Sequence, residues 1–394
     1  MKLLNRILFS KEDMSTMEKI GGYLFWLAFF FEIIYLIFKR IDYDLPLETY
    51  WLRVMTVCFG IKVLCTKYTK KEWVIIIAGG ILGIVAYYFS GRDILFRMYA
   101  MVVASKGISR DTALKTLYIS LLFSYVLFIV RGIMGIGYPI VDVRDYGRGG
   151  VEARYNFGFS HANMCHYSFW VVIAVGTLLL KEKMKWWYLV IAEVLNVVLY
   201  QFTISRTGFL VSSFFIIMVL VGMVVKEKWF DNLVLFGGVS AQIVVCVISW
   251  LSAKYGTWGK YQGLLTLVNR LLTRRVEMAG WMTSEYQLSF FSDQSVNLQY
   301  VDMGYVKLAF DYGLVYYSLY ILLTILLLIK CYREQRRSES IFLITLILYN
   351  FIESVQASNI YGTQSFLMIL LVDTWYCLLG REKSNVRESQ KQLD

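Results

Sequence analysis

The chain has 394 residues, of which 58% are hydrophobic and 18% are charged, with a formal net charge of +11 and two prolines. This composition excludes an ordinary soluble domain, in which about a quarter of the residues are charged. Apolar runs of about 20 residues recur along the chain between clusters of Lys and Arg, and this is the length that a helix needs to cross a bilayer. We therefore predict an all-α polytopic integral membrane protein, folded as a single domain over residues 1–394.

About twelve transmembrane helices are expected, with both termini on the same side of the membrane. The fourth is short and carries Arg97, so a tilted or re-entrant segment is the alternative to a full span there. The apolar runs predict spans at about residues 20–38, 47–66, 73–90, 92–105, 112–137, 161–180, 187–204, 208–225, 233–252, 304–330, 340–355 and 361–380.

The loops between these spans alternate in charge, because lysine-rich clusters occupy every second loop. Positively charged loops face the cytoplasm, so these loops, both termini and the tail 381–394 are expected to be cytoplasmic. Residues 138–160 and 253–303 then form extracytoplasmic loops, the second of which precedes the tenth helix. The net positive charge is a signal of topology and gives no reason to expect nucleic acid as a partner.

Arginine, and not lysine, dominates the loops that are expected outside. Arg148 and Arg154 lie in a glycine-broken loop, Arg206 lies in a short turn, and Arg270 and Arg274 lie in the longest loop. The guanidinium group matches phosphate oxygens with two parallel hydrogen bonds, which predicts binding of a phosphate-bearing ligand. The alternative for each arginine is contact with lipid headgroups or with acidic loop residues.

Three helices are expected to begin at the outer surface beside polar residues. Ser160 is the predicted N-cap of the sixth helix, which places His161 and Asn163 in its first turn, where free N–H groups favour an anion. Arg206 begins the eighth helix and Asp302 precedes the tenth. For His161, a capping or headgroup-facing imidazole is the alternative to a functional role.

The second outer loop carries leucines, valines and Trp281 at amphipathic spacing from about residue 264. This pattern predicts one helix on the outer face, with Arg270, Arg274 and Arg275 near its other side. Within the predicted spans, Glu32, Glu193, Asp311 and Asp373 are expected to face the interior or to pair with Lys62, Arg53 or Arg97. The histidines and cysteine of residues 161–166 lack a second ligand cluster, so we predict no metal and no cofactor.

Three outer segments resemble known motifs in their residues as well as in hydropathy. Arg154–Asn163 resembles an arginine, Gly-Phe and His-Pro-Asn entry to a membrane helix, with Ala162 in place of proline. Ser205–Gly208 resembles a Ser-Arg-Thr/Gly turn, and Asn269–Glu277 resembles an Asn-x-Leu-Leu-Ser-x-Arg-x-Glu element. Together they are similar to the Wzy-type polysaccharide polymerases, relatives of the O-antigen ligases. The similarity covers about residues 140–320, and Asp302–Tyr305 departs from the Asp-Asn-x-Tyr of many relatives.

The resemblance implies a metal-independent glycosyltransferase in the bacterial cytoplasmic membrane. Such an enzyme transfers a glycan from undecaprenyl diphosphate to a hydroxyl of another lipid-linked repeat unit, at the outer face. Arg206 and Arg275 are the expected diphosphate ligands. His161 is the expected base because an ordinary imidazole has a pKa of about 6.5, and Glu277 and Asp302 are its substitutes. The further substrate-binding residues expected from motif and position are Arg148, Arg154, Asn163, Arg270, Arg274, Glu277, Asp302 and Tyr305.

Two other functions compete with polymerisation: an O-antigen-ligase-type transfer to another acceptor, and a flippase of lipid-linked oligosaccharides. A transporter is expected to carry its charges along a central path, often in two similar halves, whereas the charges of this chain concentrate in outer loops and no repeat is visible. The expected partners are the undecaprenyl-diphosphate-linked oligosaccharide, membrane lipids, and other polysaccharide-assembly proteins such as a flippase or a chain-length regulator.

Overall fold

A computed structural model of the chain describes residues 15–137, 140–145, 150–298 and 301–354. Arg148, Asp373, the predicted twelfth span at about 361–380 and the tail 381–394 lie outside these ranges. Within them the chain is mainly helical, and eight helices are long and apolar enough to cross a membrane. This finding supports an all-α polytopic membrane protein, while the count of twelve spans stays a prediction.

The long helices coincide with predicted spans and begin at local sequence signals. Helices α2 and α4 each start with a capping box, formed by Ser15 with Glu18 and by Thr69 with Glu72. The eight are α2 (Thr16–Lys39), α4 (Lys70–Ser90), α6 (Arg110–Ile133), α7 (Ala162–Leu180), α8 (Trp186–Thr203), α9 (Arg206–Val224), α10 (Lys228–Tyr255) and α14 (Leu314–Arg333). The shorter helices are α3 (Glu48–Leu64), α5 (Ile94–Ala104), α11 (Gln262–Leu271), α12 (Arg275–Thr283), α13 (Gly304–Tyr312), α15 (Arg337–Ile352) and the 3₁₀ turn η1 (Lys181–Lys183).

Helix α7 is the central helix of the bundle. In its most apolar stretch 83% of the residues are buried, against 17–44% for the other seven long helices. It contacts α6, α8, α9 and α15, and Trp170 stacks on Phe342 of α15 with ring centroids 5.6 Å apart. A helix enclosed in this way is fixed by its neighbours, so the polar residues at its start are held in defined positions.

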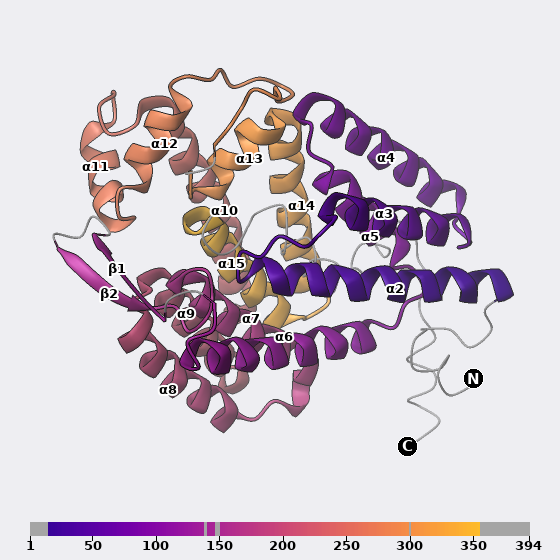
Figure 1. Ribbon diagram of the computed structural model, residues 1–394, viewed down its shortest axis with the longest axis horizontal. Helices are drawn as coiled ribbons and strands as arrows, with labels where there is room; N and C mark the ends of the chain where they lie inside the picture. The colour runs from indigo at the N-terminus through magenta and orange to yellow at the C-terminus, as the bar shows by residue number, and fades with distance from the viewer. Residues whose placement is uncertain (1–14, 138–139, 146–149, 299–300, 355–394) are drawn as a thin grey trace.

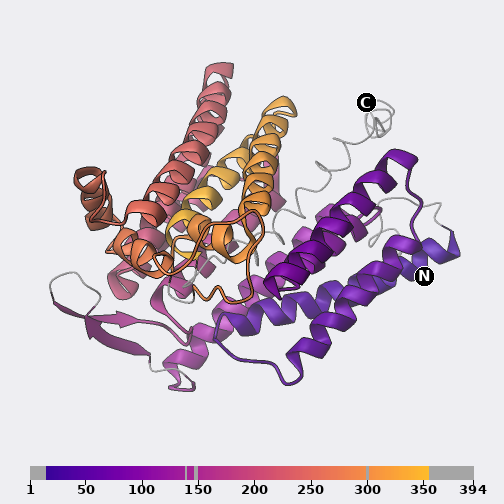
Figure 2. The same ribbon diagram turned by 90° about the horizontal axis from the view of Figure 1, so that it is seen from above.

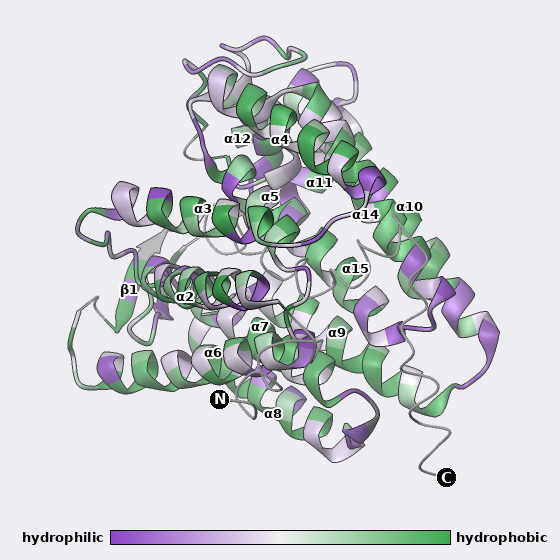
Figure 3. Ribbon diagram, turned by 90° about the vertical axis from the view of Figure 1, so that its right-hand side faces the viewer, coloured by the Kyte–Doolittle hydropathy of each residue, from purple (hydrophilic) through white to green (hydrophobic). Residues whose placement is uncertain are grey.

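The remaining helices form two groups around α6 and α7. Helices α2, α3, α4 and α5 pack on one another, and α8, α9, α10, α14 and α15 form the larger group with α7. Figure 2 shows the indigo first group on one side and the salmon-to-yellow helices on the other. Hydrophobic residues predominate along the long helices, and hydrophilic residues are more frequent at helix ends and loops (Figure 3), as expected for a protein that faces lipid.

The predicted fourth span is too short to cross a bilayer by itself. Helix α5 has 11 residues, which correspond to about 17 Å, whereas the hydrocarbon core is about 30 Å thick. Its buried Arg97 pairs with the buried Glu32 of α2, as predicted. Asp311 instead binds Lys307 at 2.9 Å and Arg92 at 3.5 Å. These pairs explain how the acids tolerate burial.

The predicted tenth span, about 304–330, is divided into α13 and α14 at Gly313. This glycine has a φ of +88°, and a Cβ there would lie 2.4 Å from the carbonyl oxygen of Phe290. The chain therefore bends because the 290–291 segment packs directly on its backbone, where only glycine fits. The prediction of one continuous helix over about residues 304–330 is therefore wrong.

The first predicted outer loop contains a hairpin that the sequence did not predict, and the second contains two helices where one was expected. Strands β1 (Val141–Asp145) and β2 (Val151–Tyr155) pair as an antiparallel hairpin, so the chain is not purely helical. The amphipathic segment forms two helices, α11 and α12, separated by Thr273 and Arg274 at positive φ. The hairpin, α11 and α12 lie on the left side of Figure 1, at the same end of the bundle.

Candidate functional site

Four polar side chains from separate parts of the chain form one hydrogen-bonded network, which we call the Glu353 network (Asn163, Arg275, Asp302 and Glu353). Nδ2 of Asn163 donates to Oε2 of Glu353 at 2.9 Å. Nη2 of Arg275 donates to the other oxygen of Glu353 at 2.6 Å, and Nε of Arg275 donates to Oδ2 of Asp302 at 3.1 Å. Three predicted site residues therefore meet, and they do so through a glutamate that was not predicted.

Electrostatic interactions are strong in this network because its side chains are largely shielded from solvent. The side chains of Arg275 and Asp302 are each 14% exposed, and that of Glu353 is 3% exposed. Burial would lower the pKa of Arg275, but Glu353 and then Asp302 raise it above its usual value. Nη1 of Arg275 is also used, since it donates to the carbonyl of Leu272 at 3.0 Å. One guanidinium and two carboxylates leave the network with a net negative charge, which is unfavourable for a second anion.

The N-cap of α7 is not the residue that the sequence predicted. His161 is the N-cap, with Nδ1 accepting from the backbone N–H of Asn163 at 3.1 Å. The predicted cap, Ser160, instead donates its backbone N–H and its hydroxyl to the carbonyl oxygen of Arg40. In this geometry Nδ1 carries no proton, so a neutral His161 ring carries it on Nε2. The neutral imidazole is then a hydrogen-bond donor, and its acceptor nitrogen is already occupied.

No protein-family model, no curated protein and no solved structure matches this chain.

Arg206 lies at the same level of the bundle as the network. Two residues further along α9, Gly208 packs so closely on α7 that a Cβ would lie 2.6 Å from Cγ of His166. The carbonyl of Gly208 also accepts from the hydroxyl of Tyr349 on α15 at 3.4 Å. Glu353 is four residues beyond Tyr349, so one helical turn separates it from this contact. Arg206 is exposed, and the described part of the chain offers it neither a hydrogen bond nor an ion pair.

The turn between α11 and α12 orders a second group of predicted residues. Arg274 binds both oxygens of Glu277, at 3.0 and 3.2 Å, and the backbone N–H of Glu277 donates to Oδ1 of Asn269 at 3.0 Å. The hydrogen bonds from Arg274 hold the pKa of Glu277 below its usual value. Glu277 is thus engaged in closing the turn, whereas Arg270 is exposed on the preceding helix.

Two other predicted substrate-binding residues are buried and bind partners outside the network. Arg154 on β2 is 2% exposed and pairs with Glu152 at 2.6 Å. Tyr305 on α13 is fully buried, and its hydroxyl donates to Oε1 of Gln242 on α10 at 3.0 Å. Asp302, just before α13, is held additionally by its carbonyl, which accepts from the backbone N–H of Ser354 at 2.8 Å.

The sequence interpretation missed two charged residues, Glu353 and Arg40. An acid at the outer end of the predicted eleventh span was a usable signal for Glu353. Arg40 ends α2, is 2% exposed, and has no hydrogen-bond partner for Nη1 or Nη2 among the described residues. Across those residues no three His, Cys, Asp or Glu side chains are grouped as metal ligands.

Proposed function

We propose that this protein is a polysaccharide polymerase that transfers an undecaprenyl-diphosphate-linked glycan to a hydroxyl of another lipid-linked repeat unit at the outer membrane face. The observation that carries this proposal is the Glu353 network, because it unites residues from segments that resemble motifs of the Wzy-type polymerases. Asn163 and Glu353 are 190 positions apart in the chain, and their side chains are 2.9 Å apart.

The exposed arginines are the better ligands for the carrier diphosphate. Arg206 and Arg270 are exposed and make no ion pair within the described residues, so their guanidinium forks are available for phosphate oxygens. Arg275 already holds two carboxylates and serves as a fixed positive centre. The proton on Nε2 of a neutral His161 adds a donor at the N-terminus of α7, where an anion is favoured.

The proton acceptor in this proposal is Asp302. The network has more carboxylates than guanidinium groups, and Asp302 is more exposed than Glu353, so an acceptor hydroxyl reaches it more easily. In the transfer step, the bond between the anomeric carbon and the diphosphate oxygen breaks and its electron pair stays with the diphosphate. The acceptor oxygen bonds to the anomeric carbon, and its proton moves to Asp302. The arginines offset the charge that grows on the leaving diphosphate.

The arrangement of charge favours transfer over transport. The network and Arg206 lie at one end of the bundle, and the ionised residues deeper in the helices are tied to partners, such as Glu32 with Arg97. A ligase-type transferase shares this chemistry and differs only in its acceptor, so the experiment must distinguish the acceptor.

The test uses purified protein in proteoliposomes with undecaprenyl-diphosphate-linked repeat units, followed by gel analysis of the glycans. A ladder of lipid-linked polymers is expected with repeat units alone. In cells that lack the protein, single repeat units are expected to persist without a ladder. Loss of outward-facing repeat units in those cells would instead indicate a flippase. Transfer that occurs only after a different acceptor is added would indicate a ligase.

A further inference from the structure

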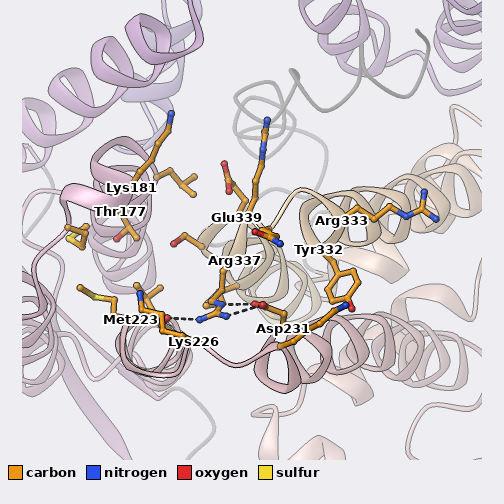
Figure 4. Close-up of a pocket in the computed structure, with 18 of the residues that line it drawn as sticks. Thr177, Lys181, Met223, Lys226, Asp231, Tyr332, Arg333, Arg337 and Glu339 are labelled. Carbon is orange, nitrogen blue, oxygen red and sulfur yellow. Dashed lines mark hydrogen bonds and ion pairs between the residues drawn. The ribbon is translucent and has the colours of Figure 1, made fainter. Parts of the chain in front are cut away.

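A polar cavity of about 960 Å³ lies between the helix ends remote from the Glu353 network. It is lined by the end of α7 with η1, the end of α9, the start of α10, the end of α14 and the start of α15. Figure 4 shows Lys181, Lys226 and Arg333 around it, with Arg337 and Asp231 between them. These helix ends carry the lysine-rich loops that are predicted to be cytoplasmic.

The lining of this cavity is strongly basic. Only two acids, Asp231 and Glu339, lie among its lining residues. The basic residues of the lining are Arg110, Lys181, Lys226, Lys228, Arg333, Arg336 and Arg337. Such an excess of positive charge around one cavity favours an anionic occupant.

Part of this charge serves the fold and builds the wall of the cavity. Arg337 binds both oxygens of Asp231, at 2.6 and 2.9 Å, and donates to the carbonyls of Gly222 and Val225 at the end of α9. Arg110 pairs with Glu339 at 2.7 Å. These contacts join α6, α9, α10 and α15 around the cavity, so its shape is set by ion pairs and helix ends.

Three other cations are available to a ligand. Lys226, Lys228 and Arg333 are exposed, and the structure gives them no hydrogen bond or ion pair within the residues it describes. The start of α15 adds donors, because its N-cap residue, Arg336, makes no side-chain capping bond. Free N–H groups in the first helical turn are a favourable environment for phosphate oxygens.

Residues beside the cavity have the exposure expected of the boundary between lipid headgroups and acyl chains. Trp229, one residue after Lys228, is 56% exposed, and Val224, two residues before Lys226, is 81% exposed. Exposed tryptophans mark the interface between membrane and water, and exposed aliphatic side chains beside them face lipid. A headgroup can therefore enter from the bilayer while its acyl chains remain along α9 and α10.

We propose that this cavity binds the headgroup of an anionic phospholipid, with a diphosphatidyl lipid of the cardiolipin class as the preferred occupant. Lys226 comes from the α9–α10 connection, Lys228 begins α10 and Arg333 ends α14, so two phosphate groups can be engaged from opposite sides. Basic cavities between transmembrane helices on the cytoplasmic side are suited to such headgroups. The proposal is independent of the polymerase activity.

The test measures lipid binding to the full-length purified protein by native mass spectrometry and by the thermal midpoint in detergent. Cardiolipin is expected to bind and to raise the midpoint, and phosphatidylcholine is expected to do neither. A triple variant, Lys226→Ala with Lys228→Ala and Arg333→Ala, is expected to bind cardiolipin about 100-fold more weakly, at about fivefold for each cation. The milder pair Lys226→Gln with Lys228→Gln tests the same site if the triple variant folds poorly.

The matched control removes three exposed lysines from the same end of the protein but outside the cavity: Lys67→Ala, Lys183→Ala and Lys185→Ala. It is expected to retain wild-type cardiolipin affinity. An equal loss in the control would overturn the proposal in favour of general surface charge. If inorganic phosphate alone raised the thermal midpoint as much as cardiolipin does, the proposal would be overturned in favour of a site for a soluble anion. Equal affinity for cardiolipin and phosphatidylcholine would exclude an anion-selective site.

Discussion

Nδ2 of Asn163 donates to Oε2 of Glu353 at 2.9 Å, and this contact joins the central helix α7 to the residue that ends α15. The same carboxylate holds Arg275 at 2.6 Å, so Glu353 fixes the position of the guanidinium relative to α7. Asp302 binds the same guanidinium through Nε and Nη2, each at 3.1 Å. The charge on Glu353 therefore influences how strongly Arg275 attracts Asp302, although Glu353 itself is nearly inaccessible.

Asp302→Asn is predicted to reduce polymerisation by about 100-fold or more, because a positioned general base contributes about 10²–10⁴ to the rate. Glu353→Gln is predicted to reduce it less, by about tenfold, because Arg275 then acts on Asp302 alone and makes that carboxylate a weaker base. Initial rates of ladder formation by purified variants measure both effects. The matched control is Glu339→Gln, since Glu339 is also a buried acid of α15 and pairs with Arg110 at the opposite end. If Glu339→Gln lost as much activity as Glu353→Gln, general destabilisation would explain both.

His161 is predicted to act through the proton on Nε2, and two amide substitutions separate this role from its capping role. The amide of Asn reaches the position of Nδ1, so His161→Asn is expected to keep the cap and lose the donor. Gln reaches the position of Nε2, so His161→Gln is expected to keep a donor and to lose about 1 kcal/mol of stability with the cap. Activity is therefore expected to be higher in the Gln variant and thermal stability higher in the Asn variant.

Polymerisation rates measured across pH 5–8 test the alternative role of His161, in which its imidazole accepts the proton. If the imidazole accepted the acceptor's proton, both amide variants would be inactive and the wild-type rate would fall at acid pH. An acid limb shared by the wild type and His161→Gln is the expected outcome, because that limb then belongs to another group. Reversal of the activity order, with Asn above Gln, would refute the donor assignment.

Arg206→Ala is predicted to slow transfer by about 100-fold at unchanged protein level, because one charge-assisted pair with a phosphate oxygen of the carrier is lost. Arg206→Lys is expected to recover only part of the rate, since an ammonium group cannot form the two parallel bonds. Arg53→Ala is the control, as Arg53 is an exposed arginine near the start of α3. Normal ladders from Arg206→Ala would remove Arg206 from the diphosphate site.

The topology predicts opposite labelling of two exposed positions in intact cells. In a cysteine-free background, Arg270→Cys is expected to react with a membrane-impermeant maleimide from outside, and Lys183→Cys is expected to react only after the membrane is opened. Both native side chains are exposed, so protection reports the side of the membrane and not burial. The reverse pattern would place the Glu353 network in the cytoplasm and exclude the proposed reaction.

Hydropathy and charge predicted most long helices because each requires only a local apolar run of sufficient length. Asn163, Arg275 and Asp302 come from or beside the motif segments, and the structure brings them into one hydrogen-bonded network. The break at Gly313 could not be predicted, because it depends on the backbone of residues 290–291 packing against it. The cap at His161 depends in the same way on a tertiary contact, as Arg40 takes the hydrogen bonds of Ser160.

The last prediction concerns Arg40. The backbone and the side chain of this residue have different roles, so a substitution can change one and keep the other. Its carbonyl oxygen accepts two hydrogen bonds from Ser160, which secures the turn before α7. Its guanidinium is 2% exposed, and Nη1 and Nη2 have no partner among the described residues. Burial lowers the pKa of Arg40 to about 10, so the group remains charged at neutral pH. A buried charge without a partner costs several kcal/mol.

Arg40→Met keeps the carbonyl and most of the side-chain volume while it removes this charge. We expect the variant to be more stable by about 2 kcal/mol, within the range for replacing buried charges by apolar side chains, and to show a higher thermal midpoint. Arg40→Ala is the comparison, because it also removes the charge but leaves a cavity, and it is expected to be less stable than Arg40→Met. A lower midpoint for Arg40→Met than for the wild type would contradict the prediction. It would mean that the guanidinium makes a stabilising contact with a residue outside the described part of the chain, and the acid of the predicted twelfth span, Asp373, is then the first to substitute.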